Sequence, residues 1–346
     1  MSVFDRPLLL GPNQPPQFYR GGAGIARLRS VAQPSPYSPE DWIGSATAAW
    51  GRSPIGLTSL PDGMTLAEAI TRDPLAAFGP THVARHGADP ALLVKLLDTA
   101  ERLVVHFHPD REFAMKHLGS VHGKTEAWVI LDVDEDRAGG AAGEVFLGFR
   151  GDVKRSKVQV WMDLQDSAAM LEALNKVSLS PGDTLLVPAG MPHALGAGLT
   201  LLELQEPTDF SILLEWAGYN IEAPHNGSLG LGHDIELDAL DVGAVGEERL
   251  QELITRAEDA PPELGVTRLL PEEADRFFVA QRIDVWDQVE LPAGYAIVLV
   301  ISGQGVIESQ ESTIEVSRGS SILCGYAAGP LRLCGQFRAL RCSPPV

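Results

Sequence analysis

The residues best suited to chemistry are histidines gathered in one short stretch. Residues 106 to 128 contain four of the nine histidines of the chain. His106 and His108 are two positions apart in a run of β-forming residues, so they are expected to project from one face of a strand. Two imidazoles on one strand face can bind one metal ion without distortion of the backbone. The spacing therefore predicts a metal site.

Two further residues complete the candidate set. Glu126 begins an expected strand at 125–134, and His193 lies in "GDTLLVPAGMPHALG". That stretch indicates a strand, a tight Pro/Gly turn and a return strand, which aims the histidine into a barrel. Three neutral imidazoles and one carboxylate suit zinc, and also manganese, iron or nickel. Each piece alone has a structural interpretation, and His117 and His122 are expected in a loop, on the surface or supporting the ligands.

Short strands are expected to build most of the chain. Its 35 glycines and 25 prolines are spread along the sequence, which favours many turns. Short helices are expected at 66–77, interrupted at Pro74, and at 167–177. Two apolar runs, 91–97 and 103–108, are interpreted as a hairpin, and strands return at regular spacing from residue 263. The pattern predicts an all-β fold of two barrel-like units with small helical insertions.

At this point the sequence resembles a known family. The HxH pair, a glutamate and G-x5-P-x-G-x2-H form the cupin pattern. The wording "VHFHPDREFAMKHLGSVHGKTEAWVILD" and "VPAGMPHALGAG" resembles the type I mannose-6-phosphate isomerases in their short bacterial form, over nearly the whole chain. The resemblance implies two cupin-type jelly-roll barrels. The first would belong to a metal-binding catalytic domain with an N-terminal extension at 1–233, and the second would be a degenerate metal-free cupin at 263–346. An acidic, partly helical linker at 234–262 would join them.

The resemblance also implies a metal set. The expected ligands of one divalent ion, zinc in the first place, are His106, His108, Glu126 and His193. The family usually has glutamine where this chain has His106, and an imidazole there should tighten metal binding.

The implied activity is an aldose–ketose isomerisation of mannose 6-phosphate and fructose 6-phosphate, or of a related sugar. It transfers a proton between C1 and C2 through an enediol, which needs a proton-transferring side chain. The candidate catalytic residues are Lys124, Glu203 and Lys95. Lys95 and Lys124 match lysines that the family places in or beside the pocket. The simpler interpretations are a solvated strand-edge lysine for Lys124 and a salt-bridged barrel residue for Glu203.

The chain departs from the family where arginines would serve a phosphate. The matching regions read "LLEWAGYN" and "GSLGLGHDIELDAL", and no arginine occurs from 156 to 248. The candidate substrate-binding residues are Arg111, Lys116, His225 and His233. Their simpler interpretation is a solvated charged helix for the first pair and surface histidines for the second. The departure leaves open an isomerase of an unphosphorylated sugar, a non-catalytic sugar-binding cupin, or a metal-dependent oxygenase.

Composition limits the partners and the compartment. A net charge of −19 argues against nucleic acid or an anionic membrane surface as partner, but it does not exclude an anionic small substrate. The resemblance implies a small-molecule sugar or sugar phosphate as the partner. Cys324, Cys334 and Cys342 have no CxxC spacing and are interpreted as reduced thiols. Neither a signal peptide nor an eighteen-residue apolar run is present, so a cytoplasmic location is expected.

Overall fold

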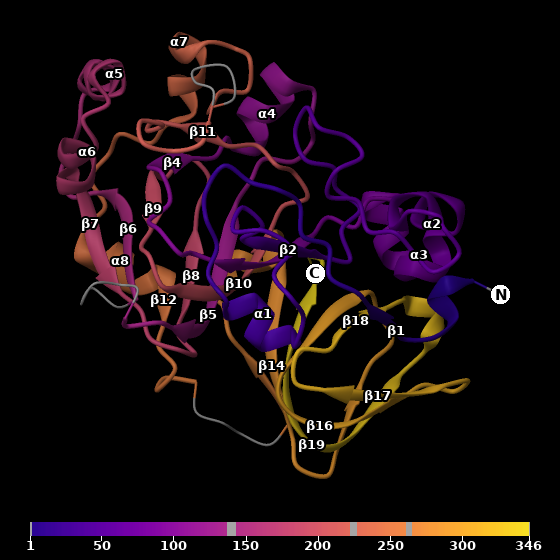
Figure 1. The fold of residues 1–346 in the computed structure, drawn as a ribbon. Helices are drawn as coiled ribbons and strands as arrows, with labels where there is room; N and C mark the ends of the chain where they lie inside the picture. Colours follow the sequence, from indigo (N-terminus) through magenta and orange to yellow (C-terminus); the bar gives the residue numbers. More distant parts are fainter. Residues whose placement is uncertain (1, 137–142, 222–226, 261–264, 346) are drawn as a thin grey trace.

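The computed structural model describes residues 2–136, 143–221, 227–260 and 265–345, and in these ranges antiparallel sheets dominate (Figure 1). A six-stranded sheet runs in the order β12 (Ile254–Thr255), β8 (Thr184–Val187), β5 (Glu126–Val133), β10 (Leu199–Gln205), β3 (Leu93–Asp98) and β2 (Glu40–Ile43). A five-stranded sheet runs in the order β11 (Ile212–Leu213), β4 (His106–Phe107), β9 (His193–Leu195), β6 (Glu144–Phe149) and β7 (Leu174–Ser178).

The C-terminal part of the chain, drawn from orange to yellow in Figure 1, forms most of an eight-stranded sheet, to which the N-terminal segment, drawn in indigo, adds one edge strand. Its main path is β1 (Leu8–Leu10), β18 (Ser321–Cys324), β16 (Ala296–Glu308), β19 (Leu331–Ser343), β14 (Val279–Val285) and β13 (Gly265–Arg268). Two further strands, β15 (Gln288–Leu291) and β17 (Thr313–Ser317), pair with β19 and β16. The antiparallel, strand-rich architecture is confirmed, and no closed barrel is found among the described strands.

Helices are short and lie around the sheets. They are α1 (Gly24–Arg29), α2 (Leu66–Arg72), α3 (Pro74–His86), α4 (Arg111–Leu118), α5 (Arg155–Leu164), α6 (Ser167–Ala173), α7 (His233–Glu236) and α8 (Glu247–Leu253). Turns of 3-10 helix lie at η1 (Val3–Asp5), η3 (Leu237–Ala239), η4 (Glu272–Arg276) and η5 (Tyr326–Ala328). None of the helices in the described ranges is long and apolar enough to cross a membrane.

Local sequence explains the helix ends beside the site. Helix α4 begins after Asp110, whose carboxylate accepts a hydrogen bond from the Phe113 amide at 2.8 Å, and ends at Gly119 with φ of 67°. The break expected at Pro74 is present, because Asp73 ends α2 and caps α3. The helix at 111–118 therefore follows directly from its capping residues.

The largest hydrophobic core lies where the sheets pack together. It joins Trp128 and Leu201 of the six-stranded sheet to Leu147 of the five-stranded one and to Leu299 and Leu340 of the C-terminal sheet. The two central strands β5 and β10 are buried along most of their length, so both of their faces are covered. Cys324 and Cys342 are buried, and the three cysteines form no disulfide.

The hairpin predicted for 91–97 and 103–108 is wrong. Strand β3 pairs with β2 and β10, whereas β4 pairs with β9 and β11 in the other sheet. The polar segment between them crosses from one sheet to the other, because Thr99 N donates to Leu199 O and Leu103 N donates to Leu195 O, both at 2.9 Å. The two runs therefore form different walls of the molecule.

The predicted boundaries at 233 and 262 stay predictions, and two short strands lie across them. Strand β1, near the N-terminus, pairs with β18 of the C-terminal sheet. Strand β12, inside the predicted linker, pairs with β8 of the six-stranded sheet. The N-terminal segment and the predicted linker therefore each add an edge strand to a sheet built mainly from another part of the chain.

Candidate metal centre and adjoining cavity

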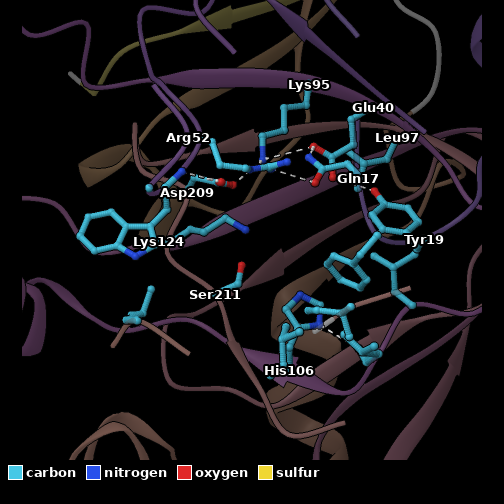
Figure 2. Close-up of a pocket in the computed structure, with 18 of the residues that line it drawn as sticks. Gln17, Tyr19, Glu40, Arg52, Lys95, Leu97, His106, Lys124, Asp209 and Ser211 are labelled. Atoms are coloured by element: carbon cyan, nitrogen blue, oxygen red, sulfur yellow. Dashed lines mark hydrogen bonds and ion pairs between the residues drawn. The ribbon is translucent and has the colours of Figure 1, made fainter. Parts of the chain in front are cut away.

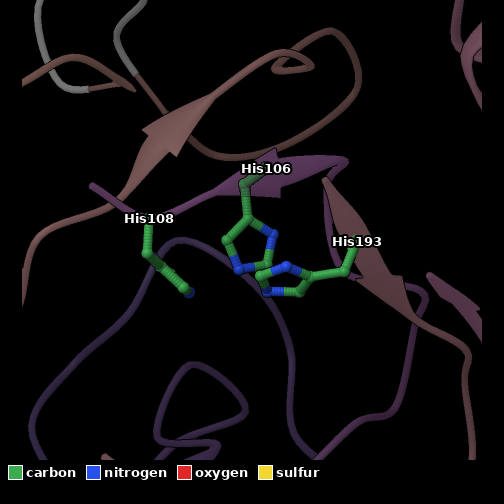
Figure 3. Close-up of side chains that lie close together, drawn as sticks. All are labelled: His106, His108 and His193. Carbon is green, nitrogen blue, oxygen red and sulfur yellow. The ribbon is translucent and has the colours of Figure 1, made fainter. Parts of the chain in front are cut away.

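Three of the expected ligands, His106, His108 and His193, lie together on the five-stranded sheet. His106 pairs directly with His193 across β4 and β9, and His108 follows β4 on the same face. One ring nitrogen from each histidine lies within 4.8 Å of the others, and all three side chains are buried (Figure 3). This group can hold a single metal ion.

Backbone carbonyls orient the three rings. The Nδ1 atoms of His106, His108 and His193 lie 2.9, 2.7 and 2.9 Å from the carbonyl oxygens of Val104, Phe210 and Met191. Each Nδ1 must therefore donate a proton, which leaves the Nε2 lone pair for a ligand bond.

Burial keeps these rings neutral. It is the main cause that places the pKa of His106 well below its usual value and lowers that of His108 to about 3, with the Lys124 ammonium adding to the shift of His108. Neutral imidazoles with their lone pairs directed inward are what a metal ion requires.

Glu126 lies beside the histidines at the start of β5. Its Oε2 is 3.0 Å from His108 Nε2, and its Oε1 is 3.3 Å from His193 Nε2. Glu126 Oε2 and His193 Nε2 are buried without a hydrogen-bond partner. Buried acceptor atoms without hydrogen bonds are costly, and a divalent cation could bind both of them. The residues present thus fit a divalent ion.

Lys124 lies beside Glu126 and His108. Its Nζ is 3.1 Å from both Glu126 Oε2 and His108 Nε2. The contact between Lys124 and Glu126 Oε2 is an ion pair, and this oxygen accepts no hydrogen bond. The ammonium and His108 hold the pKa of Glu126 well below its usual range, although burial alone would raise it. Glu126 is therefore an anion.

A cavity of about 730 Å³ opens beside the histidines (Figure 2). Its floor includes His106, Lys124 and Glu126, and its wall is formed by strands of the six-stranded sheet. The N-terminal segment at 16–19 covers one side of it. The volume suits a small ligand such as a monosaccharide.

Lys95 is the centre of a charged group in the wall of this cavity. Its Nζ lies 3.8 Å from Glu40, 3.6 Å from Glu203 and 3.8 Å from Asp209. Burial alone would lower the pKa of Lys95, but the three carboxylates outweigh burial and raise it. Burial, followed by the negative charge of Glu126, raises the pKa of Glu203 to about 7. Glu203 can therefore exchange a proton near neutral pH.

The predicted catalytic residues Lys95, Lys124 and Glu203 all line the cavity. The predicted substrate-binding residues do not gather there. Arg111 binds Glu206 at 2.6 Å and lies over the Phe277 ring, and Lys116 is exposed on α4. The His233 ring stacks on Trp216, and His225 lies outside the described residues. Arg111, Lys116 and His233 are absent from the described residues that line the cavity.

The sequence interpretation missed residues that the N-terminal segment brings to the cavity. Arg52 lines it, with its guanidinium donating to Pro16 O at 2.9 Å and to Gln17 Oε1 at 3.2 Å. Glu40 accepts hydrogen bonds from Tyr19 and Trp42 at 2.7 and 2.6 Å. The available signal was the N-terminal extension that the resemblance implies, but no local pattern says which surface this extension covers.

His122, expected in a loop, belongs to an ion-pair group behind α4. Its Nε2 lies 2.7 Å from Asp89 and its Nδ1 lies 3.8 Å from Glu206, with Arg111 and His86 nearby. Burial lowers the pKa of His122, but Asp89 and Glu206 outweigh it and raise the pKa to about 9. A His pKa raised on folding stabilises the protein below the unfolded value and loses that effect as pH rises through the folded one.

We therefore expect the stabilising contribution of His122 to be complete near pH 6 and lost by about pH 10, with a size of about 1–3 kcal/mol. Urea unfolding of the natural protein and of His122→Asn at pH 6, 8 and 10 measures it. The difference in unfolding free energy between the two should shrink with pH. A difference independent of pH would contradict the ion-pair assignment.

Comparisons with known proteins place this geometry in context. No protein-family model matches the chain. Mannose-6-phosphate isomerase ManA of Bacillus subtilis is 26% identical over 256 residues, which are 72% of this chain and 73% of that protein. The crystal structure of the mannose 6-phosphate isomerase from Bacillus subtilis aligns with a TM-score of 0.68 at 20% identity, covering 97% of this chain and 99% of that chain. A zinc-bound mannose 6-phosphate isomerase aligns with a TM-score of 0.72 at 15% identity, covering 98% of this chain and 100% of that chain.

The shared fold is thus a β-rich, cupin-like fold. Within that class, the chain is related in sequence to the mannose-6-phosphate isomerases, which confirms the resemblance stated from "VHFHPDREFAMKHLGSVHGKTEAWVILD" and "VPAGMPHALGAG".

Proposed function

We propose that this protein is a metal-dependent sugar isomerase that interconverts an aldose and a ketose. The observation that carries the proposal is the position of the buried three-histidine group beside a cavity that one of its members, His106, lines together with Glu203 and Lys95. A metal group and a titratable carboxylate are thereby exposed to the same bound molecule. The relationship to named mannose-6-phosphate isomerases supports this reaction class.

His106, His108 and His193, together with Glu126, would hold one divalent ion, with zinc as the first candidate. The zinc-bound structural neighbour supports zinc, as do three nitrogen donors and one carboxylate. When bound, the ion supplies Lewis-acid polarisation of a sugar carbonyl oxygen. The histidine–carbonyl hydrogen bonds and the Glu126 contacts fix the ligands before any ion arrives.

The chain's own residues would transfer the proton. Isomerisation removes the proton at C2 of an aldose and returns a proton to C1 through an enediol. Glu203 is a buried carboxylate of the cavity wall, which makes it the first candidate base. Lys95 holds it in place at 3.6 Å, and Lys124, which also lines the cavity, can donate to a sugar oxygen.

We also propose that the six- and five-stranded sheets are the two walls of one cupin-type jelly roll, and that the eight-stranded sheet is a second, metal-free one. The core residues shared between the first two sheets support this assignment. The expected domains at 1–233 and 263–346 would then correspond to the two units, apart from β1, which joins the second unit, and β12 of the linker, which joins the first.

The charges of the cavity raise a second substrate class, an unphosphorylated sugar. Four carboxylates, Glu40, Glu126, Glu203 and Asp209, line the described part of the cavity against three cations. Lys95 and Lys124 are already paired with carboxylates. Such a lining is less favourable for a phosphate dianion than for a neutral polyol, so both classes must be tested.

The deciding experiment follows hydrogen exchange at C2. Zinc-loaded protein is incubated with mannose 6-phosphate or with free mannose in deuterated water. Proton NMR detects the ketose that forms and the loss of the proton signal at C2 of the aldose as deuterium replaces it. Formation of either ketose with exchange supports the isomerase, and the better substrate identifies its class. Absence of exchange with a broad set of phosphorylated and free aldoses, while the protein holds its metal, would contradict the proposal.

Arg52 tests whether the substrate carries a phosphate. It is the cation that lines the described part of the cavity without a carboxylate ion pair. If it binds a phosphate, Arg52→Gln should lower kcat/KM for mannose 6-phosphate by about tenfold to a hundredfold, the value of a charge-assisted hydrogen bond. Turnover of free mannose should change less than about threefold. Exposed Arg85 on α3 provides the matched control, Arg85→Gln. Equal losses with both sugars would exclude a phosphate contact.

A further inference from the structure

A second cavity, of about 390 Å³, lies between the two β units. Helix α1 and strands β5 and β10 form one side of it, and strands β14, β16 and β19 of the C-terminal sheet form the other. It shares no lining residue with the cavity at the histidines. Its size is that of a small-metabolite pocket.

Positive charge is concentrated in this second cavity. The described lining includes four arginines, Arg27, Arg282, Arg318 and Arg338, and one acidic residue, Asp132. The chain as a whole carries a net charge of −19, so this group of cations has the opposite sign to the net charge of the protein. A local excess of guanidinium groups attracts anions.

Among the described residues, two of these arginines, Arg27 and Arg318, lack a strong carboxylate partner. Arg338 and Arg282 both donate to the one carboxylate of Asp284, at 2.5 and 2.8 Å. Arg27 lies 3.4 Å from Asp132, and both of these side chains are about half exposed, so their ion pair is weak. Arg318 has no carboxylate ion pair in the described part of the chain, and its Nη1 donates to the Arg27 carbonyl at 3.2 Å.

The fold holds these groups in fixed positions. Arg338 pairs with Asp284 on one neighbouring strand and with Ser302 on the other, beside a bulge between Val300 and Ser302. Helix α1 packs so closely on the turn after β17 that a Cβ at Gly319, whose φ is +90°, would meet Leu28 O at 2.2 Å. This close approach sets Arg318 beside the end of α1.

The remaining wall is apolar. It is formed by Leu28, Val129, Ile130, Leu131, Leu269, Ile301 and Leu340. A ligand that fits must therefore combine an anionic group, facing the arginines, with an apolar body against these side chains. Several guanidinium groups lining one cavity favour a dianion over a monoanion.

We propose that the cavity between the β units binds a small phosphate monoester with an apolar body. The site is independent of the proposed isomerase activity, because it shares no residue with the metal centre. A protein or membrane phosphate is not the expected source, because the apolar wall and the arginines enclose a volume of small-molecule size.

Phenyl phosphate is the probe, titrated calorimetrically into the full-length, zinc-loaded protein. We expect saturable binding that the double variant Arg27→Gln/Arg318→Gln weakens at least about tenfold, the value of one to two charge-assisted hydrogen bonds. These two arginines are chosen because they are exposed and their replacement leaves the Asp284 contacts intact. The matched control is Arg332→Gln, which removes an exposed ion pair with Glu308 elsewhere in the same sheet.

Three outcomes would overturn the proposal. The first is no saturable binding by the natural protein. The second is equally tight binding of phenol, which would remove the need for the anion. The third is binding that survives in the double variant but disappears in His193→Ala or Arg52→Gln, which would assign the probe to the metal cavity.

Discussion

Replacing His193 with alanine is expected to remove both the metal ion and the isomerase activity. His193 is fully buried, and its Nε2 is an orphaned acceptor that faces Glu126. Loss of a residue that merely supports a ligand weakens metal binding by about ten- to a hundredfold, so loss of a ligand should exceed a hundredfold. Turnover should fall by about a thousandfold or more, since stabilisation of charge on the sugar oxygen is lost with the ion.

Metal content after dialysis, measured by mass spectrometry of the metal, is the first readout. The matched control is His117→Ala, because His117 lies on α4 and its ring contacts Phe113, away from the cluster. His106→Gln distinguishes loss of a metal ligand from a folding defect, because glutamine keeps a polar ligand of similar length. This variant should bind zinc more weakly, yet work when zinc is in excess. Full metal content in His193→Ala would contradict the assigned centre.

The candidate metal group could be predicted from the sequence because its geometry is mostly local. A spacing of two places His106 and His108 on one strand face, and the Pro/Gly turn before His193 returns the chain into the sheet. The pairing of His106 with His193 then follows from the antiparallel sheet. The helix at 111–118 was equally local, since its caps lie at its own ends.

The direction of Arg111 and the cavity residues Arg52 and Glu40 could not be predicted in this way. Arg111 follows the metal histidines in the sequence, but its guanidinium turns to Glu206, at the end of β10. Arg52 and Glu40 reach the cavity from an N-terminal segment that has no periodic pattern. The failed hairpin has the same cause, because the partner strands of β3 and β4 lie about a hundred residues further along the chain. Contacts between segments far apart in the sequence decide where these residues and strands lie, and the residue pattern of one strand does not reveal its partners.

Glu203→Gln is expected to be the most informative change in the proton-transfer group. Glutamine preserves the shape of the side chain but cannot accept the C2 proton, so kcat should fall by about 10²- to 10⁴-fold. Metal content should stay unchanged, because no expected ligand is altered. KM should change little, since Lys95 keeps Glu40 and Asp209 as partners, each at 3.8 Å. The rate of deuterium entry at C2 measures the step directly.

Two comparison variants decide between Glu203 and its neighbours. Glu40 accepts hydrogen bonds from Tyr19, Trp42 and Gln17, so Glu40→Gln should disturb the position of the cavity wall and raise KM more than it lowers kcat. Lys124→Met removes the ammonium beside Glu126, and its metal content must be measured with its activity. If Glu203→Gln still exchanges deuterium at the natural rate while metal-loaded Lys124→Met does not, the base is Lys124. A carboxylate with a pKa near 7 would then serve only to hold Lys95, and the buried charge group would be a structural part of the wall.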